Sequence, residues 1–239
     1  MKITFLGTRG YIDAKKSRHK RHTATLLEYK NFRVMIDCGL DWLDKINTLK
    51  PDAIIITHAH PDHAWGLQHG APCPVYAAPE SWEIIKHYPI KDKQIIYHRK
   101  PFTVGPFTFE AFFVVHSIRA PGVGYRITAG NSIIFCVHDL IKIEDQQDAL
   151  ADAQLYIGDG ASITRPIIRR KGDVLFGHTT IRAQIGWCKK EKVPRAIFTH
   201  CGTQIVTGDE RILGAQVRKM GKQAGVLTSI AYDGMQLTI

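Results

Sequence analysis

The chain has 239 residues, of which 44% are hydrophobic and 23% charged, and its formal net charge is +10. This length predicts one globular domain over residues 1–239, and no apolar run approaches the roughly 18 residues of a membrane-crossing helix. The five cysteines form no Cys-x-x-Cys pair, which argues against a disulfide framework and a thiolate zinc site. The positive charge favours anionic partners, although a solvated basic surface explains it equally well.

The chain opens on a short apolar segment that predicts a strand and is too short for a signal peptide. We therefore expect a cytoplasmic protein with no membrane partner. Other strands are expected where Ile, Val, Phe and Thr gather between turn residues. In chain order, the predicted strands are Lys2–Leu6, Thr25–Tyr29, Arg33–Ile36, Ala53–Thr57, Phe107–Val115, Gly124–Thr128, Ser132–Val137, Leu155–Ile157, Ala196–Thr199 and Met235–Ile239.

Two helices are predicted late in the chain by apolar residues that recur on one face. The first contains Ile181 and Ile185, and the second follows Asp209, whose side chain can cap it. Weaker helical patterns cover Pro79–His87 and Glu144–Leu150. Strands and helices together indicate an α/β protein.

Five separate apolar strands each end in a residue that can bind a metal ion or orient a ligand. In order, these residues are Asp37, His58, His116, Asp139 and His200. A rigid sheet holds the residues at its strand ends in fixed positions, so this recurrence predicts one site at an edge of the fold.

The second of these strand ends, at His58, continues into a segment of the form His-x-His-x-Asp-His. Strand alternation sends His58 and His60 to one side, and a turn through Pro61 can bring Asp62 and His63 to a second position. Imidazole suits zinc, iron and related metals, and carboxylate adds a harder oxygen ligand. A polar turn with unrelated histidines is the alternative, but this density of ligands favours a metal site.

This motif, followed by the later ligands in the same order, resembles the metallo-β-lactamase superfamily over essentially the whole chain. The resemblance implies a four-layer αββα sandwich with the site at one edge, between the sheets. It also implies two divalent metal ions, with zinc expected and manganese or iron as alternatives. One ion would be held by His58, His60 and His116, the other by Asp62, His63 and His200, and Asp139 would bridge them.

The roles of three aspartates, Asp37, Asp139 and Asp159, differ in this comparison. Asp37 matches an early family aspartate that orients the ligands rather than binding metal. In relatives the bridging aspartate usually follows glycine, whereas Asp139 follows His138, which either supports the ligands or fills a turn. Asp159 is the competing candidate for the bridge, and Asp139 is preferred because it falls at the expected place in the chain order.

Two metal ions about 3.5–4 Å apart can supply hydroxide and bind either a phosphate or a carbonyl, so the centre alone does not select the substrate. The segment Gly177-His178-Thr179-Thr180, expected to open a helix, is similar to an element of the ribonuclease Z and PhnP-like phosphodiesterase branch. The similarity implies that His178 assists the leaving group or stabilises phosphate charge. A capping turn with an incidental histidine is the alternative. Asp62 is expected to orient the hydroxide or act as base, and Tyr125 is a strand residue or a substrate contact.

Basic residues are expected to flank the mouth of the site in two loops. One loop joins the first two strands and the other precedes His178. Both would funnel a phosphate backbone towards the metals, with a solvated surface as the alternative. The residues are Lys15, Lys16, Arg18, Lys20 and Arg21 in the first loop, and Arg169 and Arg170, together with Arg165 and Lys171, in the second.

The preferred hypothesis is a metal-dependent phosphodiesterase that acts on a small cyclic or linear phosphodiester or on unstructured RNA or DNA. The segment between His116 and Asp139 is too short for the protruding arm of dedicated tRNA-processing enzymes. The first alternative is an acyl hydrolase acting on a lactone, thioester or β-lactam, and the second is a nucleic-acid-binding module with structural metals. The pattern allows a homodimer without requiring one.

Overall fold

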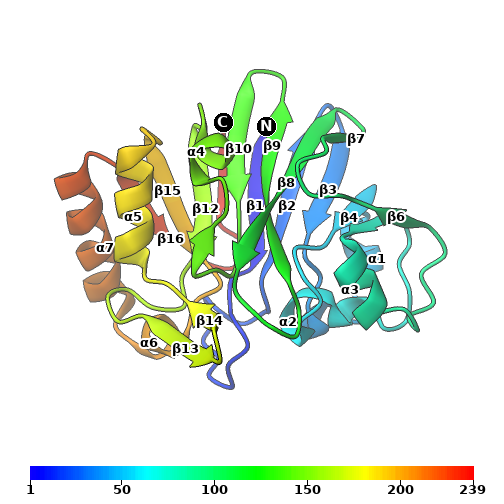
Figure 1. The fold of residues 1–239 in the computed structure, drawn as a ribbon, viewed down its shortest axis with the longest axis horizontal. Helices are drawn as coiled ribbons and strands as arrows, with labels where there is room; N and C mark the ends of the chain where they lie inside the picture. Colours follow the sequence, from blue (N-terminus) through cyan, green and yellow to red (C-terminus); the bar gives the residue numbers. More distant parts are fainter.

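In a computed structural model that describes all 239 residues, two β-sheets pack face to face between two layers of helices (Figure 1). The first sheet has the strand order β17-β1-β2-β3-β4-β5-β6. Because β1 and β17 pair in antiparallel register, the two chain termini lie side by side. The strands of this sheet are β1 (Lys2–Gly7), β2 (Ala24–Tyr29), β3 (Phe32–Ile36), β4 (Ala53–Ile55), β5 (Val75–Ala77), β6 (Lys93–Ile95) and β17 (Gln236–Thr238).

The second sheet has the order β11-β8-β9-β10-β12-β15-β16, and β7 also pairs with β8. Its strands are β7 (Phe102–Val104), β8 (Phe107–Val115), β9 (Gly122–Ala129), β10 (Ser132–Cys136), β11 (Lys142–Ile143), β12 (Leu155–Asp159), β15 (Arg195–Thr199) and β16 (Leu227–Ile230). A separate hairpin consists of β13 (Ile167–Lys171) and β14 (Val174–His178). It lies at the lower edge of the molecule in Figure 1, close to the long loop between β1 and β2.

The helices flank the two sheets, with α5 and α7 on one side of the molecule and α1 and α3 on the other (Figure 1). None of them combines the length and the apolar composition that a membrane crossing needs. The helices are α1 (Ile46–Leu49), α2 (Pro61–Ala64), α3 (Pro79–Ile84), α4 (Gln146–Leu150), α5 (Ile181–Lys190), α6 (Thr203–Thr207) and α7 (Glu210–Ala224), with 3-10 turns at Leu40–Trp42 and Trp65–Leu67.

Apolar side chains fill three layers of the molecule. The central layer lies between the sheets and joins residues such as Phe5 and Ile36 of the first sheet to Phe109 and Ile157 of the second. A second cluster packs α5 and α7 against the second sheet, and a third packs α1 and α3 against the first. This arrangement confirms the predicted four-layer αββα sandwich.

The long buried strands and both late helices lie close to their predicted positions. Thr180 caps α5 by accepting a hydrogen bond from the backbone N–H of Ala183, and Asp209 caps α7 in the same manner. The prediction was wrong for the segment before α5, which was expected to be a loop and is the β13–β14 hairpin. Every residue of β13 is exposed, so it lacks the alternation of buried and exposed residues that identifies a strand.

Candidate metal centre

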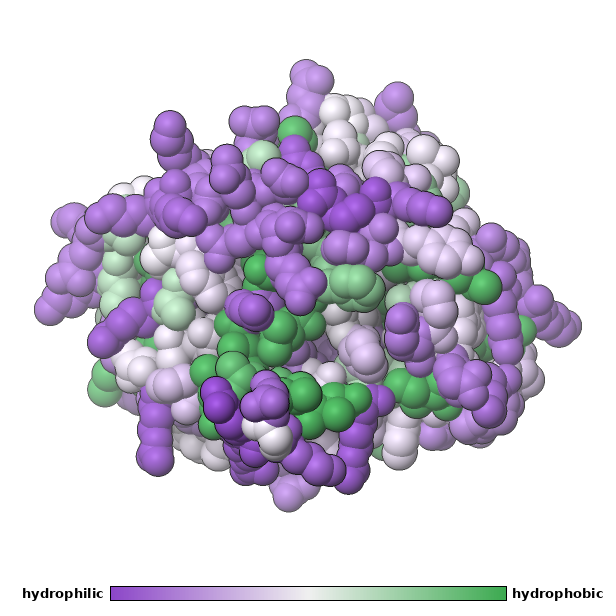
Figure 2. All heavy atoms as spheres, in the orientation of Figure 1, coloured by the Kyte–Doolittle hydropathy of each residue, from purple (hydrophilic) through white to green (hydrophobic).

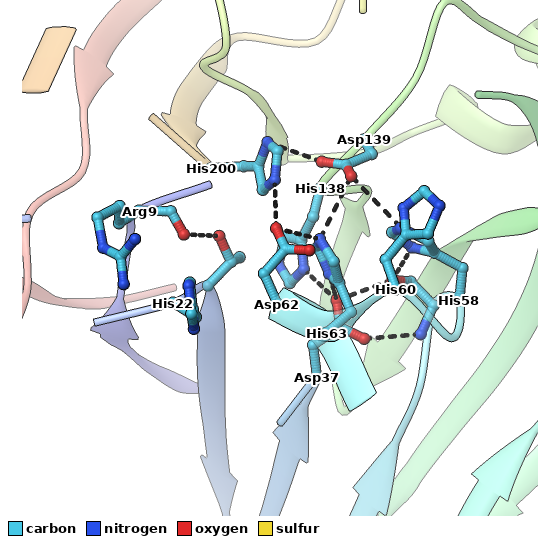
Figure 3. A network of polar contacts seen from close by, with 12 residues as sticks. Arg9, His22, Asp37, His58, His60, Asp62, His63, His138, Asp139 and His200 are labelled. Atoms are coloured by element: carbon cyan, nitrogen blue, oxygen red, sulfur yellow. Dashed lines mark hydrogen bonds and ion pairs between the residues drawn. The ribbon is translucent and has the colours of Figure 1, made fainter. Parts of the chain in front are cut away.

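Seven histidines and aspartates from both sheets converge at the sheet edge where their strands end. All of them except His116 are labelled in Figure 3. The predicted His-x-His-x-Asp-His segment follows β4 and enters α2, a single helical turn that begins at Pro61. Proline suits the first position of a helix because it has no N–H to leave unpaired. His58 and His60 lie before this turn, and Asp62 and His63 lie within it. The turn therefore divides the segment into two pairs of ligands.

The first ligand group consists of His58, His60, His116 and Asp139, whose ligand atoms all lie within 4.8 Å of one another. The His60 Nδ1 atom is 3.0 Å from the His58 Nε2 atom and 3.3 Å from the His116 Nε2 atom. Burial lowers the pKa of His58 and His60 to about 4 and that of His116 to about 3. At pH 7 the three rings are therefore neutral, which is the form of imidazole that binds a metal ion.

The second ligand group consists of Asp62, His63, Asp139 and His200, again within 4.8 Å of one another. The Asp62 Oδ2 atom is 3.0 Å from His200 Nε2 and 3.2 Å from His63 Nε2. Burial opposes charge on these two rings, but the neighbouring carboxylates outweigh it and hold the pKa of His63 and of His200 well above the ordinary value. The carboxylates of this group therefore strongly favour a positive charge beside them.

Asp139 is the one residue common to both ligand groups. Its Oδ2 atom is 3.4 Å from His58 Nε2 on one side and 3.3 Å from His63 Nε2 on the other. Asp159 belongs to neither of the two groups and instead accepts a hydrogen bond from His178. Of the two aspartates considered for the bridge, only Asp139 occupies a bridging position between the two groups.

The donor atoms of this cluster fit a divalent metal centre. Since His63 donates its Nδ1–H to Asp37, its neutral ring has a lone pair on Nε2, and this lone pair faces oxygen atoms of Asp62 and Asp139. His63 Nε2, His200 Nδ1 and Asp139 Oδ1 are buried and lack a hydrogen bond of good geometry, and the last two face each other as an ion pair at 2.7 Å. Buried polar atoms are normally paired, and a cation between them satisfies all three.

Asp37 supports the cluster from below (Figure 3). Its Oδ2 atom accepts hydrogen bonds from His63 Nδ1 at 2.7 Å and from His138 Nδ1 at 2.6 Å. The backbone N–H and the hydroxyl of Thr57 donate to the same carboxylate. Asp37 is fully buried, and His63 and His138 outweigh burial to hold its pKa below the ordinary range. Asp37 thus contacts the His63 ring at Nδ1, the nitrogen that is turned away from the other ligands. His138 donates to the same carboxylate and so helps to hold it in place.

Two residues of the centre adopt left-handed backbone conformations that L-residues rarely occupy. Asp37 has a φ of 62° and His200 a φ of 52°. Such conformations cost on the order of 1–3 kcal/mol and cluster at functional sites. The His200 ring packs against Gly10, where an added Cβ atom would lie 2.9 Å from the Cε1 atom of the ring. Packing against glycine therefore lets the loop after β1 approach the site closely.

A cavity of about 1010 Å³ opens beside the ligand cluster. His178 lines it at the end of β14 and not, as predicted, at a helix start, and its Nδ1 donates to Asp159 Oδ2 at 2.8 Å. Burial disfavours the charged ring, but Asp159 outweighs it and raises the pKa of His178. Asp159 is itself held by the backbone N–H of Ala161 at 2.7 Å. Tyr125, by contrast, lies outside the cavity as a buried strand residue.

The structure does not bring most of the predicted basic residues to this cavity. Residues 10–12 of the loop between β1 and β2 line it, but the basic residues of that loop do not. Arg18 pairs with Glu210 at 2.5 Å, and Lys16 donates to two backbone carbonyls near α6. Lys15 lies 3.7 Å from Asp41. The paths of the loop and of β13 direct the other predicted basic residues away from the cavity. These residues are Lys15, Lys16, Arg18, Lys20, Arg21 and Arg170.

Three other arginines do line the cavity: Arg119, Arg165 and Arg169. Arg165 and Arg169 belong to the basic segment that was predicted before His178, whereas Arg119 was not predicted. Arg119 follows Ile118 in the loop after β8. The one sequence signal that could have identified it is its position shortly after His116, because a loop that begins with a ligand borders the site.

Comparisons with known proteins agree with the fold described above. The model of the beta-lactamase superfamily domain matches residues 32–201. A comparison with curated protein sequences found no match. Among solved structures, the metallo-β-lactamase fold protein YhfI from Bacillus subtilis superposes with a TM-score of 0.76 at 19% identity, covering 99% of this chain and 98% of that chain.

Two further solved structures have different reported activities. A diphosphatase of the PhnP family has a TM-score of 0.73 at 20% identity and covers 100% of this chain and 97% of its own. The isothiocyanate hydrolase from Delia radicum gut bacteria has a TM-score of 0.72 at 14% identity, with 100% and 99% covered. At these identities the likeness shows the fold alone, and the substrate has to be argued from the cavity.

Proposed function

The chain belongs to the metallo-β-lactamase superfamily of metal-dependent hydrolases, and we propose that it is a phosphodiesterase. The observation that carries this proposal is His178, a proton donor held by Asp159 in a cavity that it shares with the ligand cluster and with unpaired arginines. A phosphodiester needs a centre that binds the phosphate and an acid for the departing oxygen, and the arginines favour an anionic substrate over a neutral one.

The ligand assignment in this proposal is the one that the family resemblance implies. His58, His60 and His116 would hold one metal ion, Asp62, His63 and His200 would hold the other, and Asp139, which belongs to both groups, would be shared between them, with zinc as the expected metal. When bound, two such ions activate water and neutralise charge on the phosphate. The buried atoms described above, which lack a hydrogen bond of good geometry, support this assignment.

His178 acts as the general acid. Its Nδ1 is committed to Asp159, which leaves Nε2 without a protein partner. The raised pKa keeps the ring protonated closer to neutral pH, so Nε2 can donate its proton to the departing oxygen. A His–Asp pair of this kind also holds the ring orientation while the charge changes.

Asp62 orients the attacking water. It lines the cavity, and it is held by His63 and His200. Despite burial, these two rings hold the pKa of Asp62 well below its ordinary value, so its carboxylate is a weak base. Accepting a hydrogen bond suits such a group better than removing a proton does.

The test is hydrolysis of bis-p-nitrophenyl phosphate, a 2′,3′-cyclic nucleotide and a short RNA by protein of measured zinc content. A simple lactone and nitrocefin serve as acyl substrates. We expect cleavage of at least one phosphodiester, with a loss of about 100-fold or more on RNA in His178→Ala. His69→Ala, which changes an exposed histidine far from the cavity, is the matched control. Cleavage of the acyl substrates alone, at rates indifferent to His178, would contradict the proposal.

A further inference from the structure

The three arginines that line the cavity have no carboxylate partner. Arg119, Arg165 and Arg169 form no ion pair, whereas Arg9 pairs with Asp41 and Arg99 with three acidic side chains. Guanidinium groups gathered around one recess repel one another unless an anion lies between them. Arginine binds phosphate through two parallel hydrogen bonds, which makes it the usual residue for this recognition.

The charge of these arginines exceeds what the reacting group needs. A phosphodiester carries one negative charge, and in the proposed function the metal centre and His178 already meet it. The only carboxylates that line the cavity are Asp62 and Asp139, and both belong to the ligand cluster. The cavity volume of about 1010 Å³ is at the upper end of ordinary ligand sites, so it has room for more than the scissile group.

The β13 strand shows how the chain selects which basic residue faces the cavity. Successive side chains of a strand point to opposite faces. Ile167 and Arg169 line the cavity, while Ile168 and Arg170 between and beyond them do not. The cavity therefore receives one apolar and one cationic side chain from this strand. Tyr11, in the loop after β1, adds an aromatic ring to the same wall.

From these contacts, and resting on the proposed function, we infer that the substrate carries a second anionic group, a terminal phosphate, outside the scissile diester. Arg119, Arg165 and Arg169 bind this terminal phosphate. The organic part of the substrate packs against Tyr11 and Ile167. Hydrophilic side chains cover most of the face of the molecule in Figure 2, and apolar residues gather at and below its centre.

The test measures competition against hydrolysis of bis-p-nitrophenyl phosphate, which has no second anionic group. The competitors are dithymidine phosphodiesters with no terminal phosphate, with a 5′-phosphate and with a 3′-phosphate. We expect a terminal phosphate at one end to lower the inhibition constant about tenfold, as one to two charged hydrogen bonds would. This preference should fall below about twofold in the triple variant R119Q/R165Q/R169Q.

R170Q is the matched control, because Arg170 lies next to Arg169 on the same exposed strand but outside the cavity, and it should keep the full preference. Equal inhibition constants for the three competitors would overturn the inference while hydrolysis of the reporter still supports the phosphodiesterase. A preference that survives in the triple variant would also overturn it. Absence of reporter hydrolysis would instead count against the proposed function.

His138 provides a second inference from a different observation. A single oxygen, Asp37 Oδ2, accepts hydrogen bonds from His63, His138 and Thr57. His138 is fully buried and directly precedes Asp139 in the chain. We propose that His138 is a positioning residue that acts through Asp37 on the ring of His63 and thereby sets the metal affinity of the second ligand group.

The readout is the zinc dissociation constant, measured by competition with a chromogenic chelator. His138→Leu removes the donor and should raise this constant about 10- to 100-fold. His138→Asn places an amide N–H near the position of Nδ1 and should keep the constant within about threefold of wild type. Wild-type affinity in folded His138→Leu would overturn the proposal. If that variant does not fold, His138→Asn decides, and a tenfold loss of affinity there would overturn it.

Discussion

Replacing Asp159 with asparagine tests the assignment of His178 as the general acid. The substitution keeps the size of the side chain and removes the charge that lies 2.8 Å from His178 Nδ1. A hydrogen bond to a charged group contributes about 1.5–3 kcal/mol, which corresponds to a loss of roughly 10- to 150-fold in the step that needs the acid. The exposed Asp148, changed to asparagine in the same way, is the control.

The leaving group separates this effect from a general loss of structure. p-Nitrophenolate departs without receiving a proton, whereas the sugar hydroxyl of a dinucleotide needs one. Asp159→Asn should therefore slow dinucleotide cleavage by the full factor and slow bis-p-nitrophenyl phosphate cleavage by less than about threefold. Equal losses on both substrates would refute the assignment of His178 as the acid.

The pH profile gives the second readout of the same variant. In the wild type, Asp159 outweighs burial and raises the pKa of His178 above its ordinary value of 6.5. The acidic form of the ring is therefore complete at low pH and is lost as the pH rises through that raised pKa. Without the carboxylate, burial dominates and the loss begins at lower pH, so the alkaline limb of kcat/KM should move towards acid. An unmoved limb would contradict the reasoning.

Three simpler changes test other parts of the structure. Gly10→Ala places a Cβ atom 2.9 Å from the His200 ring and should weaken zinc binding about tenfold in a chelator competition, whereas Gly186→Ala, with open space around it, should not. Tyr125→Phe removes the buried hydrogen bond to the carbonyl of Ile56 and should lower the free energy of unfolding in urea by about 1–2 kcal/mol. Removal of metal with a chelator should lower Tm, because metal at 100 times its dissociation constant contributes about 2.7 kcal/mol; an unchanged Tm in any metal-loaded sample would contradict a bound metal.

The fold was predictable to the extent that burial is regular along the chain. β8 alternates buried and more exposed positions except at Ala111 and Phe112, which are both buried, and its predicted bounds agree with the observed ones. The short edge strand β6 was missed, because it is exposed at every position and carries no such pattern. The hairpin of β13 and β14 was missed for the same reason, and with it the true position of His178 at a strand end.

The local part of the site was predictable because its chemistry is local. His58, His60, Asp62 and His63 fall within six residues, and no packing is needed to recognise a metal-binding pattern at that density. The chain order of the later strand ends extended the pattern to His200. Which of Asp139 and Asp159 lies between the two groups could not be decided this way, since both follow strands of the same sheet.

The linear order of residues thus determined the fold class and the ligand types, because both arise from repeating patterns of burial and from short motifs. The tertiary structure decided which side chains meet. Lys15 to Arg21 resembled a basic funnel, but Lys15, Arg18 and Lys16 contact Asp41, Glu210 and a backbone carbonyl, because the loop folds back on the molecule. Arg119 and Arg165 come from loops far apart in the chain, and only the packing of the two sheets brings them to one cavity.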